Sequence, residues 1–226
     1  MSSVACTLLV VAKAPVAGLA KTRLAEAVGP EAAAALAAAA LLDTLDAVRS
    51  LDATAHVVAL TGDLGLAHRA DELDVMLADF VVLPQRGVGL DERIAAAHAD
   101  AAAVAPGPVL QIGMDTPQIT TGLLAASATA LARPDVGGVF GPAADGGWWA
   151  LGLSDPRSAI FLRGIPMSQS DTGARTLAGL QRTVGTVVQL PELTDVDTVA
   201  DLWPVAALQP ADSRFRLAVE RQGLVP

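Results

Sequence analysis

The chain has 226 residues, of which 15 are lysine or arginine and 24 are acidic, so its formal net charge at pH 7 is −9. Hydrophobic residues make up 52% of the sequence, more than a disordered chain carries, so we expect a folded globule. The acidic balance argues against a nucleic-acid-binding protein, which needs basic residues to neutralise phosphates. The single cysteine, Cys6, excludes a disulfide framework and a zinc–thiolate cluster.

Nothing in the sequence predicts a membrane segment or a histidine metal site. The apolar run at residues 4–12 has no basic residues before it and stops at Lys13, short of the roughly 20 apolar residues that a spanning helix needs. His56, His68 and His98 are far apart and lack metal-ligand spacing, which argues against a zinc site. We therefore expect a cytoplasmic protein with no membrane partner.

Short apolar runs alternate with stretches of helical period along the whole chain. Strands are predicted at residues 7–12, 56–60, 80–83, 108–113, 136–140, 148–153 and 186–190. Helices are predicted at residues 30–50, 63–72, 90–104, 120–132, 198–207 and 212–222. This alternation is typical of β-α-β units, so we expect a doubly wound α/β fold whose mostly parallel sheet is flanked by helices. A single domain spanning residues 1–226 is the simplest organisation.

Polar or glycine-rich segments follow four of the predicted strands. They occupy residues 13–23, 85–89, 115–118 and 144–147. Ligands of such sheets bind beyond the carboxyl ends of the strands, so these segments are expected to form one site.

The segment after the first strand carries Lys13, Lys21 and Arg23. These two lysines are the only ones in the chain, beside thirteen arginines, so their closeness favours a function. A P-loop is excluded because Ala20 precedes Lys21 and Pro15 stands where the first glycine is needed. Lysine supplies point charge and arginine a bidentate fork, so a polyphosphate is the expected ligand. The alternative is a solvated basic loop.

Asp115, at the end of an apolar strand, is the first candidate metal ligand. A carboxylate there is costly unless it is paired, and Mg²⁺ or Mn²⁺ bound with substrate phosphates is a suitable partner. The alternative is that Asp115 caps the next helix, although Thr120 competes for that role. Asp195 and Asp197 share one side of an extended segment. Asp197 either completes the metal site or caps the helix predicted from residue 198.

Two later segments are candidates for ligand binding. The glycines beside Asp145 allow a ligand to approach the backbone closely. Trp148 and Trp149 are expected to point to opposite faces of a strand. Residues 168–173, which include Asp171, are either part of the site or a helix cap.

Residues 13–24, 113–118, 141–151, 167–174 and 195–202 resemble the DUF2064 family in order and spacing. Its members are inferred glycosyltransferases, also called transferase 1 (radical-SAM/selenodomain-associated). The resemblance implies the nucleotide-diphospho-sugar transferase (GT-A) fold, whose relatives include molybdenum-cofactor and phospholactate guanylyltransferases.

The resemblance also implies roles for individual residues. Asp115 and Asp197 would bind Mg²⁺ or Mn²⁺, while Asp145 and Asp171 would face the acceptor. In the leading hypothesis given below, Arg86 and the Gly87 to Gly89 turn would lie near the nucleobase or ribose. The nucleotide and diphosphate loop would contain Lys13, Gly18, Lys21, Thr22 and Arg23.

Three functions follow from these residues. The leading hypothesis is a metal-dependent transferase that moves a glycosyl group from a nucleotide sugar to a small-molecule acceptor, with Asp145 or Asp171 as general base and Lys21 adding charge stabilisation. The first alternative is a guanylyltransferase-like nucleotidyltransferase that uses a nucleoside triphosphate and releases pyrophosphate. The second is a nucleotide-binding protein without catalysis, because Asp115 does not begin an Asp-x-Asp pattern.

Overall fold

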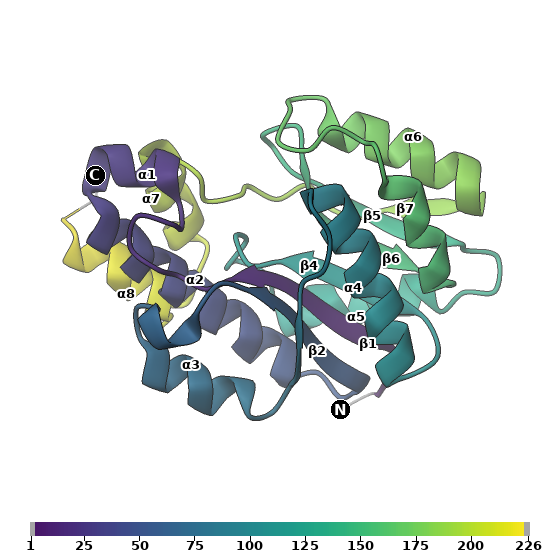
Figure 1. The fold of residues 1–226 in the computed structure, drawn as a ribbon, viewed down its shortest axis with the longest axis horizontal. Helices are drawn as coiled ribbons and strands as arrows, with labels where there is room; N and C mark the ends of the chain where they lie inside the picture. The colour runs from purple at the N-terminus through teal and green to yellow at the C-terminus, as the bar shows by residue number, and fades with distance from the viewer. Residues whose placement is uncertain (1–2, 224–226) are drawn as a thin grey trace.

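The computed structural model describes residues 3–223, which fold around a seven-stranded sheet (Figure 1). The strand order is β3-β2-β1-β4-β6-β5-β7, and only β6 runs antiparallel to its neighbours. This confirms the expected doubly wound, mostly parallel α/β sheet. The strands are β1 (Val4–Lys13), β2 (Ala53–Thr61), β3 (Val81–Pro84), β4 (Val109–Gly113), β5 (Gly138–Pro142), β6 (Trp148–Leu153) and β7 (Val187–Gln189).

Helices cover both faces of this sheet. Helices α2, α3 and α5 pack on one face, and α4, α6 and the 3₁₀ helix η2 pack on the other. Within residues 3–223, no helix has the length and apolar character needed to cross a membrane. The helices are α1 (Thr22–Val28), α2 (Pro30–Arg49), η1 (Leu64–Leu66), α3 (Ala70–Leu77), α4 (Leu90–Val104), α5 (Thr121–Leu131), η2 (Pro156–Leu162), α6 (Thr172–Val184), α7 (Val199–Ala207) and α8 (Arg214–Arg221).

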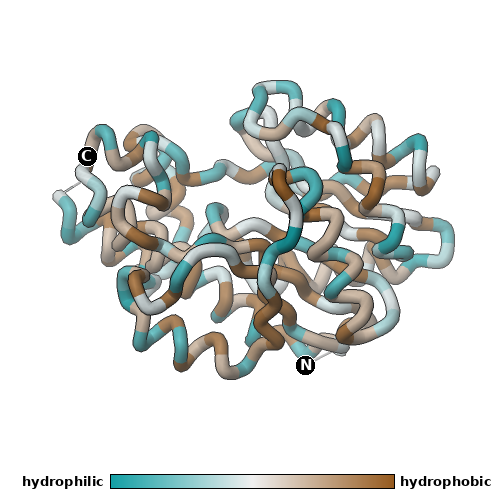
Figure 2. The backbone as a smooth tube through the Cα atoms, viewed as in Figure 1, coloured by the Kyte–Doolittle hydropathy of each residue, from teal (hydrophilic) through white to brown (hydrophobic). Residues whose placement is uncertain are grey.

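The central strand β1 is buried on both faces because helices cover both. Leu8 and Val10 pack toward α2, whereas Leu9 packs toward α4, and all three are almost completely buried. A strand of this kind needs a continuous apolar run, which is why β1 was recognisable in the sequence. Figure 2 shows the hydrophobic residues concentrated in the middle of the molecule and hydrophilic ones in peripheral loops.

A second packing unit lies at one end of the molecule, where α1, α7 and α8 gather against the first half of α2 (Figure 1). Its centre is Phe215, which is fully buried. The Asp43 carboxylate of α2 accepts the backbone N–H of Phe215 at 2.8 Å and so holds the start of α8. The chain must therefore return from β7 to this unit, and the connecting residues cross the carboxyl ends of the central strands.

The structure corrects one predicted helix and adds three that were not predicted. The helix expected at residues 63–72 is instead η1 followed by α3, which continues to Leu77. The Asp63 carboxylate accepts the N–H of Gly65 and caps the start of η1, and Arg69 adopts a left-handed conformation immediately before α3. The added helices are α1, η2 and α6; Gly29, with φ of 86°, separates α1 from α2.

His98 of α4 is fully buried, and neither ring nitrogen has a hydrogen-bond partner among the described residues. Burial lowers the pKa of His98 from 6.5 to about 4, against a smaller raising effect from Gln111. The fold therefore favours neutral His98, and the unfolded chain takes up a proton first as the pH falls. Its contribution to stability is complete above pH 6.5 and is lost between pH 6.5 and 4.

This shift predicts a pH-dependent loss of stability. On account of His98, we expect the free energy of unfolding to fall by about 2 kcal/mol between pH 7 and pH 5. The His98→Leu variant should lack that part of the decline, because leucine fills a similar volume and does not titrate. Urea unfolding of both proteins at the two pH values measures the difference; an equal decline in both would contradict the prediction.

Candidate functional site

The site lies beyond the carboxyl ends of β1 and β4, which are neighbours in the sheet. Strand connections leave these two strands in opposite directions, and ligands of open α/β sheets bind at such a switch point. The backbone N–H of Lys13, at the end of β1, lies 3.1 Å from the Met114 sulfur. The segments that follow the two strands therefore begin side by side, as the sequence predicted.

Lys21 binds two of the predicted metal ligands at once. Its Nζ atom lies 2.8 Å from Asp115 Oδ1 and 2.9 Å from Asp197 Oδ1, and its side chain is only 8% exposed. Burial by itself lowers the pKa of Lys21. The charges of Asp115 and Asp197 and their hydrogen bonds raise the pKa by more than burial lowers it, so the pKa lies above its usual value. Lys21 is therefore a charged, enclosed ammonium group.

The backbone of Lys21 is unusual as well. Its φ of 50° and ψ of 49° place it in the left-handed region, immediately before α1. A lysine there costs about 1–2 kcal/mol, and strain of this kind concentrates at functional sites. The two ion pairs of Lys21 form while its backbone is in this conformation, so their stabilisation offsets the cost.

Backbone contacts bring Asp115 and Asp197 together from distant parts of the chain. The N–H of Val196 donates to the Asp115 carbonyl at 2.9 Å, and the Gln118 side chain donates to the Thr194 carbonyl at 2.7 Å. The segment between β7 and α7 is thus fixed across the end of β4. Sequence spacing predicted each carboxylate but could not predict this crossing.

The capping alternatives for the two aspartates are wrong. The Thr120 hydroxyl accepts the N–H of Leu123 and caps α5, so Asp115 is not needed there. At the start of α7, the Asp201 carboxylate accepts the backbone N–H groups of Asp197 and Thr198. The carboxylate of Asp197 therefore has no capping role and stays with Lys21.

Asp195, the alternative to Asp197 as second metal ligand, lies among the other carboxylates. Burial, and then the charges of Asp115 and Asp145, raise the pKa of Asp195 to about 7, and the opposing charge of Lys21 does not cancel the effect. We call Asp115, Asp145, Asp195 and Asp197 the carboxylate cluster. The sequence indicated Asp195 as well as Asp197, because both lie on the same side of the extended segment.

The carboxylate cluster suits a divalent metal ion in charge and chemistry. It has four carboxyl groups, and Lys21 is the cation that forms ion pairs with two of them, Asp115 and Asp197. Its oxygens are the hard ligands that Mg²⁺ and Mn²⁺ take, normally as one or two carboxylates completed by substrate phosphates. Within residues 3–223, no three acidic, histidine or cysteine side chains form a ready metal site. These carboxylates therefore fit a metal ion whose remaining coordination positions are filled by a bound substrate.

The turn between β5 and β6 supplies Asp145 to the carboxylate cluster. The Asp145 carboxylate accepts the N–H of Gly147 at 2.8 Å, which orders the turn. The N–H of Gly173 donates to the Gly146 carbonyl at 2.7 Å and docks the start of α6 on it. Asp171, one of the predicted acceptor residues, is exposed and pairs with Arg175 at 2.7 Å. Of these two carboxylates, only Asp145 contributes to the pKa shift of Asp195.

The tryptophans after this turn point to opposite faces, as predicted. Trp149 is buried in the core beneath α2, α3 and α5, where its indole N–H donates to the Pro191 carbonyl at 2.9 Å. Trp148 packs on the other side against Phe140 and is half-buried.

The remaining predicted residues of the nucleotide loop line its outer part. The Lys13 ammonium donates to the Leu19 carbonyl at 2.6 Å and is exposed. Arg23 Nη1 lies 3.6 Å from Asp197 Oδ2, with 69% of its side chain exposed. Gly18 has a φ of 76°, which closes the loop, and Thr22 is the exposed first residue of α1.

Arg86 and Gly87 are not part of the carboxylate cluster. The Arg86 guanidinium forms a two-point ion pair with Asp100 of α4 on the surface. Gly87 has a φ of 126°, and its carbonyl accepts from the Arg93 side chain. A ligand would have to displace Asp100 before Arg86 could bind it.

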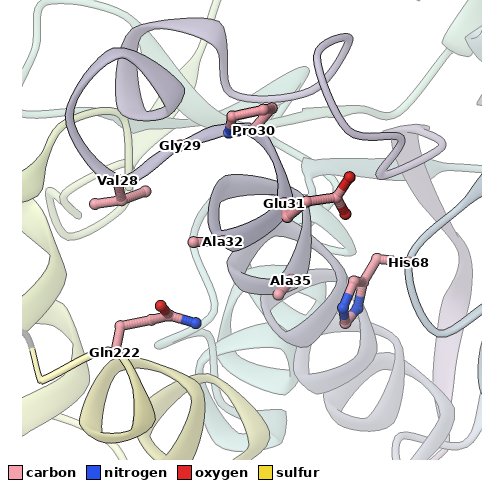
Figure 3. Close-up of a pocket in the computed structure, with 8 residues that line it drawn as sticks. All are labelled: Val28, Gly29, Pro30, Glu31, Ala32, Ala35, His68 and Gln222. Carbon is pink, nitrogen blue, oxygen red and sulfur yellow. The ribbon is translucent and has the colours of Figure 1, made fainter.

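Two hollows in the surface lie apart from the carboxylate cluster. One, of about 500 Å³, has Ala32 and Ala35 of α2 as its floor, with Glu31 and His68 on one side (Figure 3). The other, of about 370 Å³, lies beside Arg86 and Asp100. Neither hollow is lined by a residue of the carboxylate cluster. The first hollow is lined by Val28, Gly29, Pro30, Glu31, Ala32, Ala35, His68 and Gln222.

The fold is that of nucleotide-diphospho-sugar transferases. A crystal structure of a candidate nucleotide-diphospho-sugar transferase from Desulfovibrio desulfuricans G20 is 28% identical, with a TM-score of 0.81; the match covers 99% of this chain and 97% of that one. More distant likenesses of fold include a cytidylyltransferase from Leptospira borgpetersenii serovar Hardjo-bovis (13% identity, TM-score 0.54, 97% and 94% covered). Another is Rv0371c of Mycobacterium tuberculosis in complex with manganese (17%, 0.50, 88% and 95%).

A family model described as uncharacterised proteins conserved in bacteria (DUF2064) matches residues 44–169, more than half of the chain. The chain belongs to the DUF2064 family, in agreement with the resemblance found in its sequence. No curated protein matches it.

Proposed function

We propose that this protein is a metal-dependent transferase that uses a nucleotide-activated donor and moves a glycosyl group to a small-molecule acceptor. The observation that carries the proposal is the pairing of Lys21 with Asp115 and Asp197 at the switch point of the sheet. It joins a cation suited to phosphate with carboxylates suited to a divalent metal. The fold shared with the Desulfovibrio protein supports the same class of donor.

The donor's diphosphate would lie over the loop between β1 and α1. Lys13, Lys21 and Arg23 present positive charge there, and Lys13 and Arg23 are exposed to solvent, where a phosphate can reach them. Asp115 and Asp197 would hold Mg²⁺ or Mn²⁺; the manganese complex of Rv0371c, a protein of similar fold, agrees with this. When bound, the metal would supply charge neutralisation for the diphosphate leaving group.

The acceptor would lie on the side of β5 and β6. Asp145 lies on the turn between these strands, and we propose it as the residue that accepts the proton of an acceptor hydroxyl. Asp171 is the weaker candidate because its carboxylate is engaged by Arg175 at 2.7 Å. The start of α6, docked on Gly146, would form the wall of the acceptor site.

Nucleotidyl transfer is the second candidate function. The cluster of cations in the β1–α1 loop suits a triphosphate, and a cytidylyltransferase shares the fold. Such an enzyme would join a nucleoside monophosphate unit to a phosphorylated acceptor and release pyrophosphate.

A ligand panel tests the proposal. Nucleotide sugars and nucleoside triphosphates, each with and without Mg²⁺ or Mn²⁺, are compared by thermal shift. A ligand at a hundredfold excess over its dissociation constant should stabilise the fold by about 2.7 kcal/mol. We expect a metal-dependent shift with a nucleotide sugar, followed by release of nucleoside diphosphate on adding acceptors.

The other possible results of the ligand panel would support a different function or contradict the proposal. A shift confined to triphosphates, with release of pyrophosphate, would establish nucleotidyl transfer instead. Nucleotide binding that ignores the metal would favour a binding protein without catalysis, and the absence of any shift would contradict the proposal.

A further inference from the structure

Lys21 binds Asp115 and Asp197 from the buried side of the site. Its ammonium group is within 2.9 Å of one oxygen of each carboxylate, and its side chain is 8% exposed. The Asp115 and Asp197 side chains remain 39% and 38% exposed, so a solvent cation can approach them from outside. One oxygen of each carboxylate is therefore already paired with a cation.

A divalent metal and this ammonium group compete for the same oxygens. Both are positively charged, and they repel each other in a partly enclosed site where solvent screens charge poorly. The oxygens can be shared only if the ammonium group moves away or the metal binds at the outer edge. An ammonium group leaves such a site readily only when another anion takes it, because an unpaired buried charge is costly.

We propose that Lys21 acts as a built-in counter-ion that keeps the metal off Asp115 and Asp197 until a phosphate group of the donor draws it away. The metal then binds tightly only together with the donor, so that binding of the two is coupled. The identity of the donor rests on the proposed function; the competition between Lys21 and the metal does not.

Two features of the loop that carries Lys21 bear on this movement. Gly18 has a φ of 76°, and no other atom lies within 4 Å of the position its Cβ would take. Lys21 itself is in a strained left-handed conformation, which its ion pairs hold in place. Loss of those ion pairs therefore removes the reason for the strained conformation.

The test measures Mn²⁺ binding to the metal-free, nucleotide-free chain by electron paramagnetic resonance or calorimetry. We expect the Lys21→Met variant to bind Mn²⁺ about tenfold more tightly than the wild type, because the competing cation is gone. Equal or weaker binding by Lys21→Met would overturn the proposal.

Lys13→Met is the matched control. It removes the same charge from the same loop, but Lys13 donates to the Leu19 carbonyl and binds no carboxylate. Its Mn²⁺ affinity should stay within about twofold of the wild type, since exposed charges are screened by solvent. Equal tightening in both variants would reduce the effect to net charge and overturn the proposed competition.

A measurement on the wild type keeps the test valid if Lys21→Met does not fold. The chain has only two lysines, so the ammonium signals of Lys21 and Lys13 can be followed by ¹⁵N nuclear magnetic resonance and assigned with Lys13→Arg. Saturating Mg²⁺ should move the Lys21 signal. If the signal does not move although Mg²⁺ binds, the metal does not compete with Lys21 and the proposal fails.

Failure of this inference differs from failure of the proposed function. If no nucleotide or nucleotide sugar binds, the proposed function fails, whereas tighter Mn²⁺ binding by Lys21→Met still establishes the competition. If a donor binds with metal but Lys21→Met and wild type have equal Mn²⁺ affinity, only the inference fails.

Discussion

An Asp115→Asn variant is expected to lose metal-dependent turnover by a factor of about 1000. Asparagine keeps the size of the side chain but removes one negative charge from the pair that holds Lys21 and is suited to a metal ion. Loss of one group that stabilises developing charge costs enzymes roughly 100- to 1000-fold in kcat. The measurement is the rate of nucleoside diphosphate release from the donor identified by the ligand panel, with the metal varied.

The control for Asp115→Asn is Asp135→Asn. Asp135 pairs with Arg133 on the surface and lies before β5, at the opposite edge of the sheet, so the same charge change there should leave turnover unchanged. Both variants should keep a thermal midpoint within a few degrees of the wild type. If Asp115→Asn had an activity close to that of the wild type, Asp115 would have no role in metal-dependent turnover.

A Gly146→Ala variant is expected to lose about 2–4 kcal/mol of unfolding free energy. Gly146 has a φ of 88°, and a Cβ there would lie 2.0 Å from the Ser170 carbonyl oxygen. The methyl group cannot be accommodated unless the chain before α6 moves, which would also break the 2.7 Å hydrogen bond from Gly173. Urea unfolding at pH 7 measures the loss.

Gly164→Ala separates backbone strain from the close contact. Gly164 has a φ of 83°, but nothing lies within 4 Å of the position of its Cβ. This variant should lose only the roughly 1–2 kcal/mol that a left-handed conformation costs an alanine. Equal losses in the two variants would show that the contact between Gly146 and Ser170 contributes nothing.

The fold was largely predictable because its signals are local. Strand β1 is covered by helices on both faces and so must be a continuous apolar run, and α4 was predicted with the bounds that the structure has. Helix α1 was not predicted: it is only seven residues long, and the break at Gly29 and Pro30 was read only as the start of α2. Helix α6 was given no range in the sequence, although a helix cap at residues 168–173 was one of the two readings of that segment.

The candidate site was predictable only in part. Lys21, Asp115 and Asp197 were chosen for their chemistry and their places after predicted strands, and the structure brings these three together. Arg86 was chosen by the same reasoning, but it pairs with Asp100 instead. Position along a strand indicates which edge of the sheet a side chain is near, but not which partner its charge finds.

The sequence by itself determined the α/β class, the family and the segments at the carboxyl edge, because these depend on periodicity and on residue types close together in the chain. The tertiary structure decided that residues 195–197 cross the end of β4, that Asp195 lies among the other carboxylates, and that Lys21 is enclosed between Asp115 and Asp197. These contacts join residues far apart in the chain. Their physical reason is packing: the chain must return from β7 to the unit around Phe215, and on its way it carries two carboxylates past a buried cation.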